Sequence, residues 1–135
     1  MAVKFSVAVR NARLDALETA IGTSAVLKIR SGSAPTNITD ADSGTVLATL
    51  SLPSDWMANA ASGSKSKSGT WQDTSADNTG TAAHFRLYAS DGTTQHMQGS
   101  ITATGGGGDM TVDNTSFVTG QSFTVTAFTL TDDNG

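Results

Sequence analysis

The stretch HFRLYASDGTTQHMQGSI, residues 84–101, gives the clearest indication of the fold of this chain. Apolar and polar side chains alternate on both sides of the turn signal Ser90-Asp91-Gly92. This pattern is typical of a β-hairpin, because successive side chains of a strand point to opposite faces and Asp-Gly favours a tight turn. The remaining segments are interpreted around this hairpin.

Two registers fit the hairpin, and they differ in the length of the turn. A three-residue turn places Phe85 opposite Met97 on one face and Arg86 opposite His96 on the other. A two-residue turn would place Phe85 opposite Gln98, so that an apolar and a polar side chain share one face of the hairpin. We therefore expect the three-residue turn.

Short runs of the same kind recur along the rest of the chain, separated by turn-forming residues. They lie at 25–30, at 45–52, from residue 71 onward, in pieces between 101 and 120 around a four-glycine turn, and at 123–130. The last run changes phase near Ala127, which predicts a β-bulge. Seven or eight short strands preceded by one helix predict a mainly β chain, built as an antiparallel β-sandwich or jelly-roll-like domain.

The helix candidate spans residues 7–21. Its apolar residues, Val7, Leu14, Leu17 and Ile21, fall at helical spacing, and Gly22 is placed to end the helix. Two interpretations stay open: the apolar face covers the chain's own sheet, or it docks onto a neighbouring subunit. We expect one domain over residues 1–135, with a helical segment at 1–22 and the β-sandwich at 25–131.

Several polar segments are expected at the surface. Residues 62–69, SGSKSKSG, have no apolar side chain and are expected to form a mobile, exposed loop that carries Lys65 and Lys67. A single helical turn is expected after Pro53, and the acidic tail from Asp132 is expected to fray.

Composition and charge exclude several classes of function. The 135 residues include no cysteine, which excludes disulfides, thiolate metal sites and cysteine nucleophiles. The net charge of -4 is concentrated in residues 68–135, which carry one basic and seven acidic side chains, and this balance disfavours nucleic-acid binding. No apolar run approaches the ~18 residues of a membrane span, and the run after Lys4 is too short for a signal peptide. We therefore expect no nucleic acid, no membrane and no signal peptide.

The candidate catalytic bases are two histidines. His84 and His96 are expected on the solvent-side face of the hairpin beside Arg86 and Tyr88, without a nucleophile motif or a third zinc ligand. A structural or surface role is therefore expected for both.

Oxygen ligands occur together in the polar connection at 31–44. Asn37, Asp40 and Asp42 lack the third acidic position and closing Glu of an EF-hand, so solvated carboxylates are expected. The single Glu, Glu18, lies on the polar face of the helix, which leaves no acid for glycoside hydrolysis. We predict no enzyme, no metal and no cofactor.

Three aromatic residues have two interpretations. Trp56, Trp71 and Tyr88 could form an exposed platform that stacks on sugar rings. In a chain this poor in aromatic residues, we expect both tryptophans in the core instead.

Long segments of the chain resemble a small, uncharacterised virion structural protein family of tailed bacteriophages and prophages. The resemblance lies in the segments RNARLDALETAIGTS (Arg10 to Ser24), DSGTVLATLSLPSDWM (Asp42 to Met57), SGSKSKSGTW (Ser62 to Trp71), HFRLYASDGTT and HMQGS of the hairpin, and DNTSFVTGQSFTVTAFTL (Asp113 to Leu130). It implies a virion component and assigns no catalytic residue.

The expected function is that of a head decoration or cementing protein, made in the host cytoplasm and located on the virion. Its partners would be the major capsid protein or other virion proteins, in a homo-oligomer for which a trimer is favoured. Alternatives are an adaptor of the tail, neck or fibre base, and a carbohydrate-binding module for receptor recognition. The residues expected to contact the partner are Val7, Arg10, Arg13, Leu14, Leu17, Lys65 and Lys67.

Overall fold

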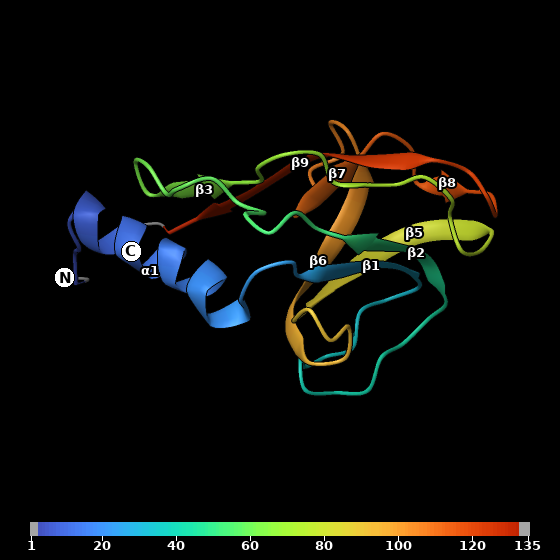
Figure 1. Cartoon of the computed structure of the whole chain (residues 1–135), viewed down its shortest axis with the longest axis horizontal. Coiled ribbons are helices and arrows are strands. Elements are labelled where there is room, and N and C mark those ends of the chain that lie inside the picture. The colour runs from blue at the N-terminus through green and yellow to red at the C-terminus, as the bar shows by residue number, and fades with distance from the viewer. Residues whose placement is uncertain (1–2, 133–135) are drawn as a thin grey trace.

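A computed structural model describes residues 3–132 and shows a mainly β chain preceded by one helix, which confirms the predicted fold class (Figure 1). The helix is α1 (Val7–Ile21). Within the described range nine strands follow: β1 (Val26–Ser31), β2 (Val46–Ser51), β3 (Ser64–Ser66), β4 (Gln72–Asp73), β5 (Gly80–Tyr88), β6 (Gln95–Ala103), β7 (Met110–Val112), β8 (Ser116–Phe117) and β9 (Phe123–Thr131).

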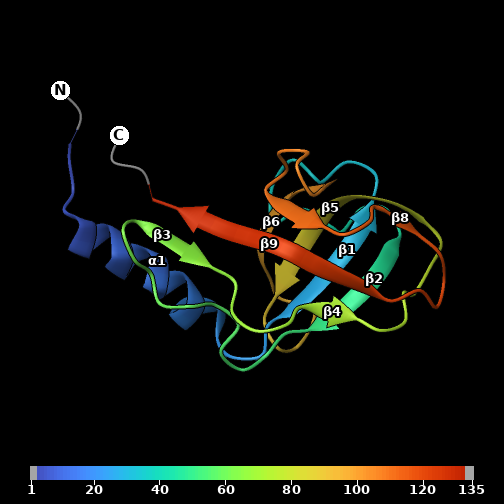
Figure 2. The ribbon, with the colours of Figure 1, turned by 90° about the horizontal axis from the view of Figure 1, so that it is seen from above.

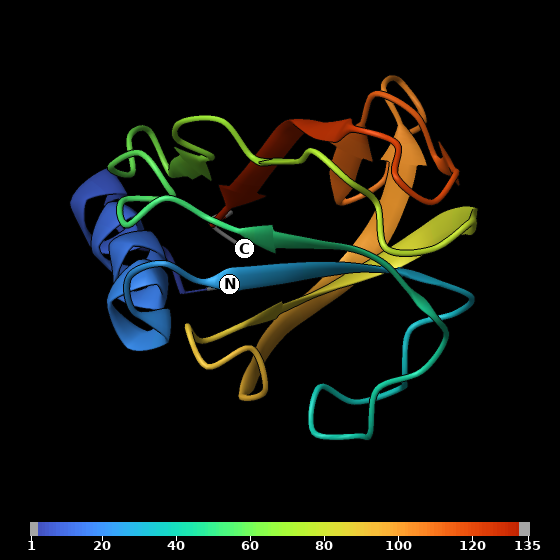
Figure 3. The ribbon, with the colours of Figure 1, turned by 45° about the vertical axis from the view of Figure 1, so that its right-hand side comes forward.

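The strands form one curled sheet with the order β2-β1-β5-β6-β7-β9-β3, while β4 pairs with β9 and β8 pairs with β5. Figures 2 and 3 show that β9 crosses over the layer made by β1, β2, β5 and β6. The core lies between these two layers. The strand pairs are antiparallel except for β6 and β7, which run parallel, so the sheet is mixed where the sequence predicted antiparallel pairing throughout.

The parallel pair depends on the glycine-rich turn at 105–108. Only six residues, 104–109, separate β6 from β7, whereas parallel strands usually need a crossover of about a dozen. Gly106 and Gly108 lie against Thr102, where an added Cβ would come within 2.7 Å of the Thr102 Cβ and 2.9 Å of its backbone nitrogen. The absence of side chains at these positions therefore permits the tight return.

An aromatic stack runs through the core. The rings of Trp56 and Trp71 lie 6.1 Å apart, those of Trp71 and Phe128 5.7 Å, and those of Phe128 and Phe85 5.6 Å. All four side chains are buried, which confirms the core interpretation of both tryptophans. The Trp56 Nε1–H donates to the Gly22 carbonyl oxygen at 2.9 Å, so the stack also contacts the end of α1.

β5 and β6 form the predicted hairpin, but both registers considered from the sequence are wrong. Phe85 pairs with Gly99 and Leu87 with Met97, a shift of two residues from the expected register. An added Cβ at Gly99 would come within 2.7 Å of the Phe85 ring, so this glycine leaves the space that the ring fills. The connection is longer than expected because a bulge follows Leu87 and the Asp91 carboxylate accepts N–H groups of the turn.

The two helix ends and the bulge in the last strand are confirmed. The Ser6 hydroxyl accepts the Val9 N–H at the start of α1, and Gly22 ends the helix with a φ of 93°. The pairing of β7 with β9 shifts between Val125 and Ala127, where the phase change predicted a bulge.

The helical turn expected after Pro53 is wrong. Trp56 and Met57 lie in an irregular segment, and Met57 forms an isolated antiparallel bridge with Lys67. Burial of the Trp56 ring in the aromatic stack fixes this segment in place of a local helical turn.

The prediction of a mobile, exposed loop at 62–69 is wrong for the centre of this segment, which forms the strand β3. Lys65 pairs with Leu130 of β9, and its side chain is 1% exposed. Asp132 is also ordered: its N–H donates to the Gly63 carbonyl oxygen at 2.9 Å, and its carboxylate pairs with Arg13 at 3.1 Å. The rest of the acidic tail that was expected to fray, 133–135, lies outside the described residues.

Candidate functional site

A buried charged cluster lies between the outer face of β1 and β5 and the loop at 32–45. The Asp42 carboxylate accepts hydrogen bonds from Arg30 Nη2, Arg86 Nη1 and Tyr88 Oη, each at 2.8 Å. Arg86 and Tyr88 are buried, so the expectation of a solvent-side face here is wrong. The alternation along β5 is real, but the loop covers the polar face. Asp42 keeps 33% of its side chain exposed, so it is partly solvated, as expected, while its carboxylate also bonds to this cluster.

The protonation states in this cluster follow from its contacts. Burial alone would raise the pKa of Asp42, but the hydrogen bonds from Tyr88 and Arg86 and the charge of Arg30 hold it below its ordinary value. Burial and the bond to Asp42 raise the pKa of the Tyr88 phenol. Asp42 is therefore ionised and Tyr88 protonated near neutral pH, and the cluster holds the loop on the sheet.

The two histidines lie in different environments, and the structure does not bring them together. His84 is buried under the loop, and its Nδ1 lies 2.6 Å from the Gly32 carbonyl oxygen, to which it donates. Burial lowers the pKa of His84, and the charges of Arg30 and Arg86 lower it further. His96 is exposed, as expected, and lies four residues from the His84 partner Ser100, which is about 13 Å along β6.

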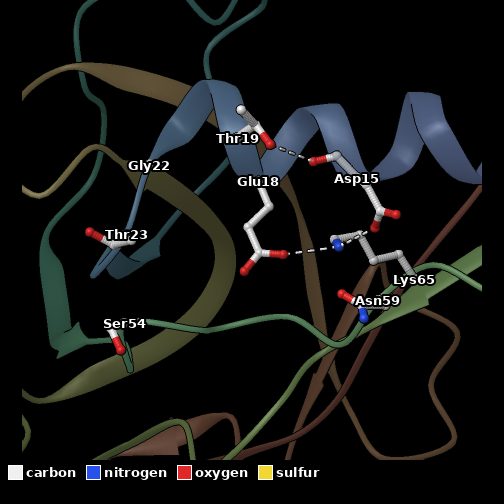
Figure 4. Close-up of a pocket in the computed structure, with 8 residues that line it drawn as sticks. All are labelled: Asp15, Glu18, Thr19, Gly22, Thr23, Ser54, Asn59 and Lys65. Atoms are coloured by element: carbon white, nitrogen blue, oxygen red, sulfur yellow. Dashed lines mark hydrogen bonds and ion pairs between the residues drawn. The ribbon is translucent and has the colours of Figure 1, made fainter.

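A second buried cation, Lys65, fixes α1 to β3 (Figure 4). Its Nζ donates to Asp15 Oδ1 at 2.7 Å, to Glu18 Oε2 at 2.9 Å and to the Ala58 carbonyl oxygen at 3.0 Å. These contacts use all three N–H groups of an ammonium. Asp15 also accepts the Ala60 N–H at 2.9 Å, so one turn of the helix contacts two segments of the chain.

A hollow of about 380 Å³ opens beside Lys65, but the charged groups on its wall neutralise one another. It is lined by Asp15, Glu18, Thr19, Gly22, Thr23, Ser54, Asn59 and Lys65. Burial alone would lower the pKa of Lys65, yet the hydrogen bonds that its ammonium donates to Asp15 and Glu18 raise the pKa above its ordinary value. The bond from Lys65 holds the pKa of Asp15 low. An amine kept protonated in this way is a poor nucleophile or general base.

The residues expected to contact a partner divide into two groups. Leu14 is 4% exposed and Lys65 1%, because both side chains pack inside the chain. Neither side chain is therefore accessible to a partner. Arg10 is half-buried and donates to the Asp132 carbonyl oxygen at 3.2 Å. The others keep part of their side chain at the surface: Val7 and Leu17 are exposed, Arg13 is 53% exposed, and Lys67 is half-buried over Trp71.

α1 lies at one end of the molecule, beside β3 (Figures 1 and 2). Three of its apolar side chains, Val7, Val9 and Leu17, are 45%, 43% and 38% exposed, with Val9 on the opposite side of the helix from Val7, and we call these three residues the helix surface. Val9 was missed by the sequence interpretation, because it lies on the side of the helix opposite the predicted stripe. The interpretation in which the whole apolar face covers the chain's own sheet therefore holds for Leu14 and Ile21 alone.

A short extended arm precedes the helix, and it too exposes apolar side chains. Val3 is 73% exposed and Phe5 41%, with the Arg13 guanidinium 5.0 Å from the centre of the Phe5 ring. The alternation V-K-F-S-V over residues 3–7 was a usable signal in the sequence.

The aromatic platform for sugar binding is overturned by the structure. Trp56 and Trp71 are 0% exposed and Tyr88 is 1% exposed. A sugar ring can stack only on an accessible aromatic face, so these three residues cannot carry a carbohydrate site.

Among residues 3–132, no group of three or more His, Cys, Asp or Glu side chains is arranged to hold a metal ion. The helix in this range is too short and too polar to cross a membrane.

Comparisons of the chain with protein families, with curated proteins and with solved structures found no match.

Proposed function

We propose that this chain is a non-enzymatic structural protein of a bacteriophage virion, a head decoration protein that binds the capsid shell through the helix surface. The observation that carries the proposal is the exposure of Val7, Val9 and Leu17 on α1, the helix at one end of the molecule. Exposed apolar side chains on one element are a feature of protein contact sites.

The internal pairing of charged side chains also supports a structural role. Lys65 and Arg86 have the burial that functional ionisable groups often have, but each is bonded to carboxylates of the same chain. These groups stabilise the positions of the loop and the helix.

Docking is tested with Val9→Asp and Leu17→Asp, alone and combined, in binding to purified particles that lack the protein. We expect the double variant to lose about a hundredfold in affinity, because an unpaired carboxylate would be desolvated in the contact. The control is Val118→Asp, since Val118 is 57% exposed and lies near β8 at the other end of the molecule. Unchanged binding by the double variant would remove the helix surface from the proposal.

The place on the virion is tested by copy number. Quantitative mass spectrometry of purified particles should find an amount comparable to that of the major capsid protein. A few copies per particle would overturn the decoration role and favour an adaptor of the tail or neck. Absence from the particles would overturn the virion role itself.

A further inference from the structure

The curled sheet has an open seam between β6 and β9. β7 lies between these strands, but it pairs with β6 only at 101–103 and with β9 only as far as Phe128. Beyond it, Thr129 to Thr131 of β9 pair with β3 on one side, and no described strand pairs with the other side. The same holds for Gln95 to Gly99 of β6, which pair with β5 alone. Two strand edges therefore face the seam.

A hollow of about 370 Å³ lies between the two edges, and its lining is partly apolar. The apolar part comes from Phe85, Met97, Phe128 and Leu130, and the polar part from Gln98, Asp109, Thr129 and Thr131. Met97 and Leu130 are only partly buried, and both pack on the core. Backbone groups at open edges, beside apolar side chains that an added residue can cover, are the features that bind an added strand.

The arm at residues 3–6 has the properties of such a strand. In an extended segment Val3 and Phe5 point to one side and Lys4 and Ser6 to the other. Four residues in this conformation span about 13 Å, against about 10 Å for the three-residue edge of β9. The arm is therefore long enough to fill the seam. Its two apolar side chains lie on the same side, so both could face the apolar side chains that line the seam.

Within one copy the arm leads away from the seam. The Ser6 hydroxyl caps α1, the Phe5 ring lies near Arg13 of the helix, and the chain before the helix runs away from the sheet (Figure 2). A second copy is consequently the matching recipient.

We propose that residues 3–6 of one copy insert as an added strand into the β6–β9 seam of a second copy. This inference extends the proposed function, because an arm and a seam at different places on the molecule form a head-to-tail contact. Repeated head-to-tail contacts close into a ring when the rotation between copies allows. The helix surface stays free in such an assembly to bind the shell.

Cysteine cross-linking tests the contact directly, since the native chain has no cysteine. A chain with Phe5→Cys is mixed with a chain carrying Met97→Cys and exposed to oxidised glutathione, and a second mixture uses Val3→Cys. We expect a disulfide-linked heterodimer in at least one mixture. The matched control replaces Met97→Cys by Val118→Cys, which is exposed and distant from the seam, and should give only background cross-linking.

Complementation keeps the test independent of any one variant. Val3→Asp with Phe5→Ser removes the arm contact, and Met97→Lys removes the seam contact. Sedimentation should show oligomers for the native chain, monomers for each variant alone, and a heterodimer when the two are mixed, because one intact arm then meets one intact seam. Thermal unfolding of each variant checks that it is folded.

Four outcomes would overturn the proposal: a monomeric native chain, oligomers that persist in the arm variant, no heterodimer on mixing two folded variants, or cross-linking to Met97→Cys that does not exceed the background given by Val118→Cys. The failure of arm exchange is distinguishable from the failure of the proposed function. Particles would still retain the arm variant if only the exchange were wrong, whereas the virion role is decided by the presence and number of copies on particles.

Discussion

Lys65 and Arg86 are both buried cations, but they stabilise different kinds of contact. Lys65 directs its ammonium at two carboxylates of one helical turn, Asp15 and Glu18. Arg86 shares a single carboxylate, Asp42, with Arg30 and gives its other hydrogen bonds to backbone carbonyls and an amide oxygen. A planar guanidinium with five donors can contact a loop at several points, whereas an ammonium concentrates its donors in one place. Arg86 therefore holds the loop at several points, whereas Lys65 holds the helix at one turn. Arg10 and Arg13 add separate contacts to Asp132.

The largest effect is expected from Arg86→Met. The substitution removes the bonds from Arg86 to the carbonyl oxygens of Asn37 and Asp40 and to Gln98, and it leaves Asp42 with one fewer cation. Removing one partner of a buried ion pair typically costs 3–5 kcal/mol, but Asp42 is 33% exposed and keeps Arg30, so we expect the free energy of unfolding to fall by about 3 kcal/mol. Urea unfolding followed by tryptophan fluorescence measures this change.

The control for Arg86→Met is Lys28→Met on the neighbouring strand. Lys28 pairs directly with Arg86 in the β1–β5 ladder, but it is only half-buried and lies 4.9 Å from the Tyr88 ring centre. We expect a loss of about 1 kcal/mol or less. Equal losses in the two variants would contradict the assignment of Arg86 as the main support of the loop.

A smaller effect is expected from Lys65→Met, which leaves Asp15 and Glu18 without their shared cation. The Asp15 side chain is 44% exposed and can be solvated again, so we expect a loss of about 2 kcal/mol, below the range for a fully buried pair. Hydrogen exchange should rise in α1 before it rises in β5. Lys67→Met is the matched control, because the Lys67 ammonium donates to the Gly69 carbonyl oxygen, lies 6.0 Å from the Trp71 ring centre and is half-exposed, with no carboxylate among these contacts. A loss in Lys67→Met as large as in Lys65→Met would contradict this account.

The difference between the two cations also shows what the sequence could and could not predict. The helix at 7–21, the hairpin and the bulge near Ala127 follow from local periodicity, and the structure confirms them. The burial of Lys65 does not follow, because its partners Asp15 and Glu18 lie about fifty residues earlier in the chain. A serine-rich segment with lysines has the same local pattern whether or not a helix packs on it.

The prediction that the polar face of β5 points to solvent was wrong for a related reason. Alternation shows which residues share a face, but it does not show whether a loop covers that face. The hairpin register depended on the space that Gly99 leaves for the Phe85 ring, a tertiary contact that no turn rule contains. The helix surface was found in part, since Val7 and Leu17 lie on the predicted stripe, whereas Val9 does not. Long-range packing decided each of these differences.

The smallest effect is expected from His84, which lies on the face of β5 that the loop at 32–45 covers. It should make the free energy of unfolding depend on pH. Its folded pKa is lowered from 6.5 by burial and by the nearby arginines, so below about pH 6.5 the unfolded chain binds a proton that the folded chain does not. Stability should therefore fall as the pH falls from 6.5 toward the folded pKa, by at most about 1.4 kcal/mol per pH unit. The lowered pKa of Asp42 keeps that carboxylate ionised throughout this window.

His84→Gln, whose amide can still donate to the Gly32 carbonyl oxygen, should lose this pH dependence of stability. Urea unfolding at a series of pH values measures it, with the loss at high pH giving the constant cost of the substitution. If the free energy of unfolding of the native chain and of His84→Gln varied with pH in parallel, the buried imidazole would accept its proton in the folded state. The loop would then open more easily over His84 than over the neighbouring arginines.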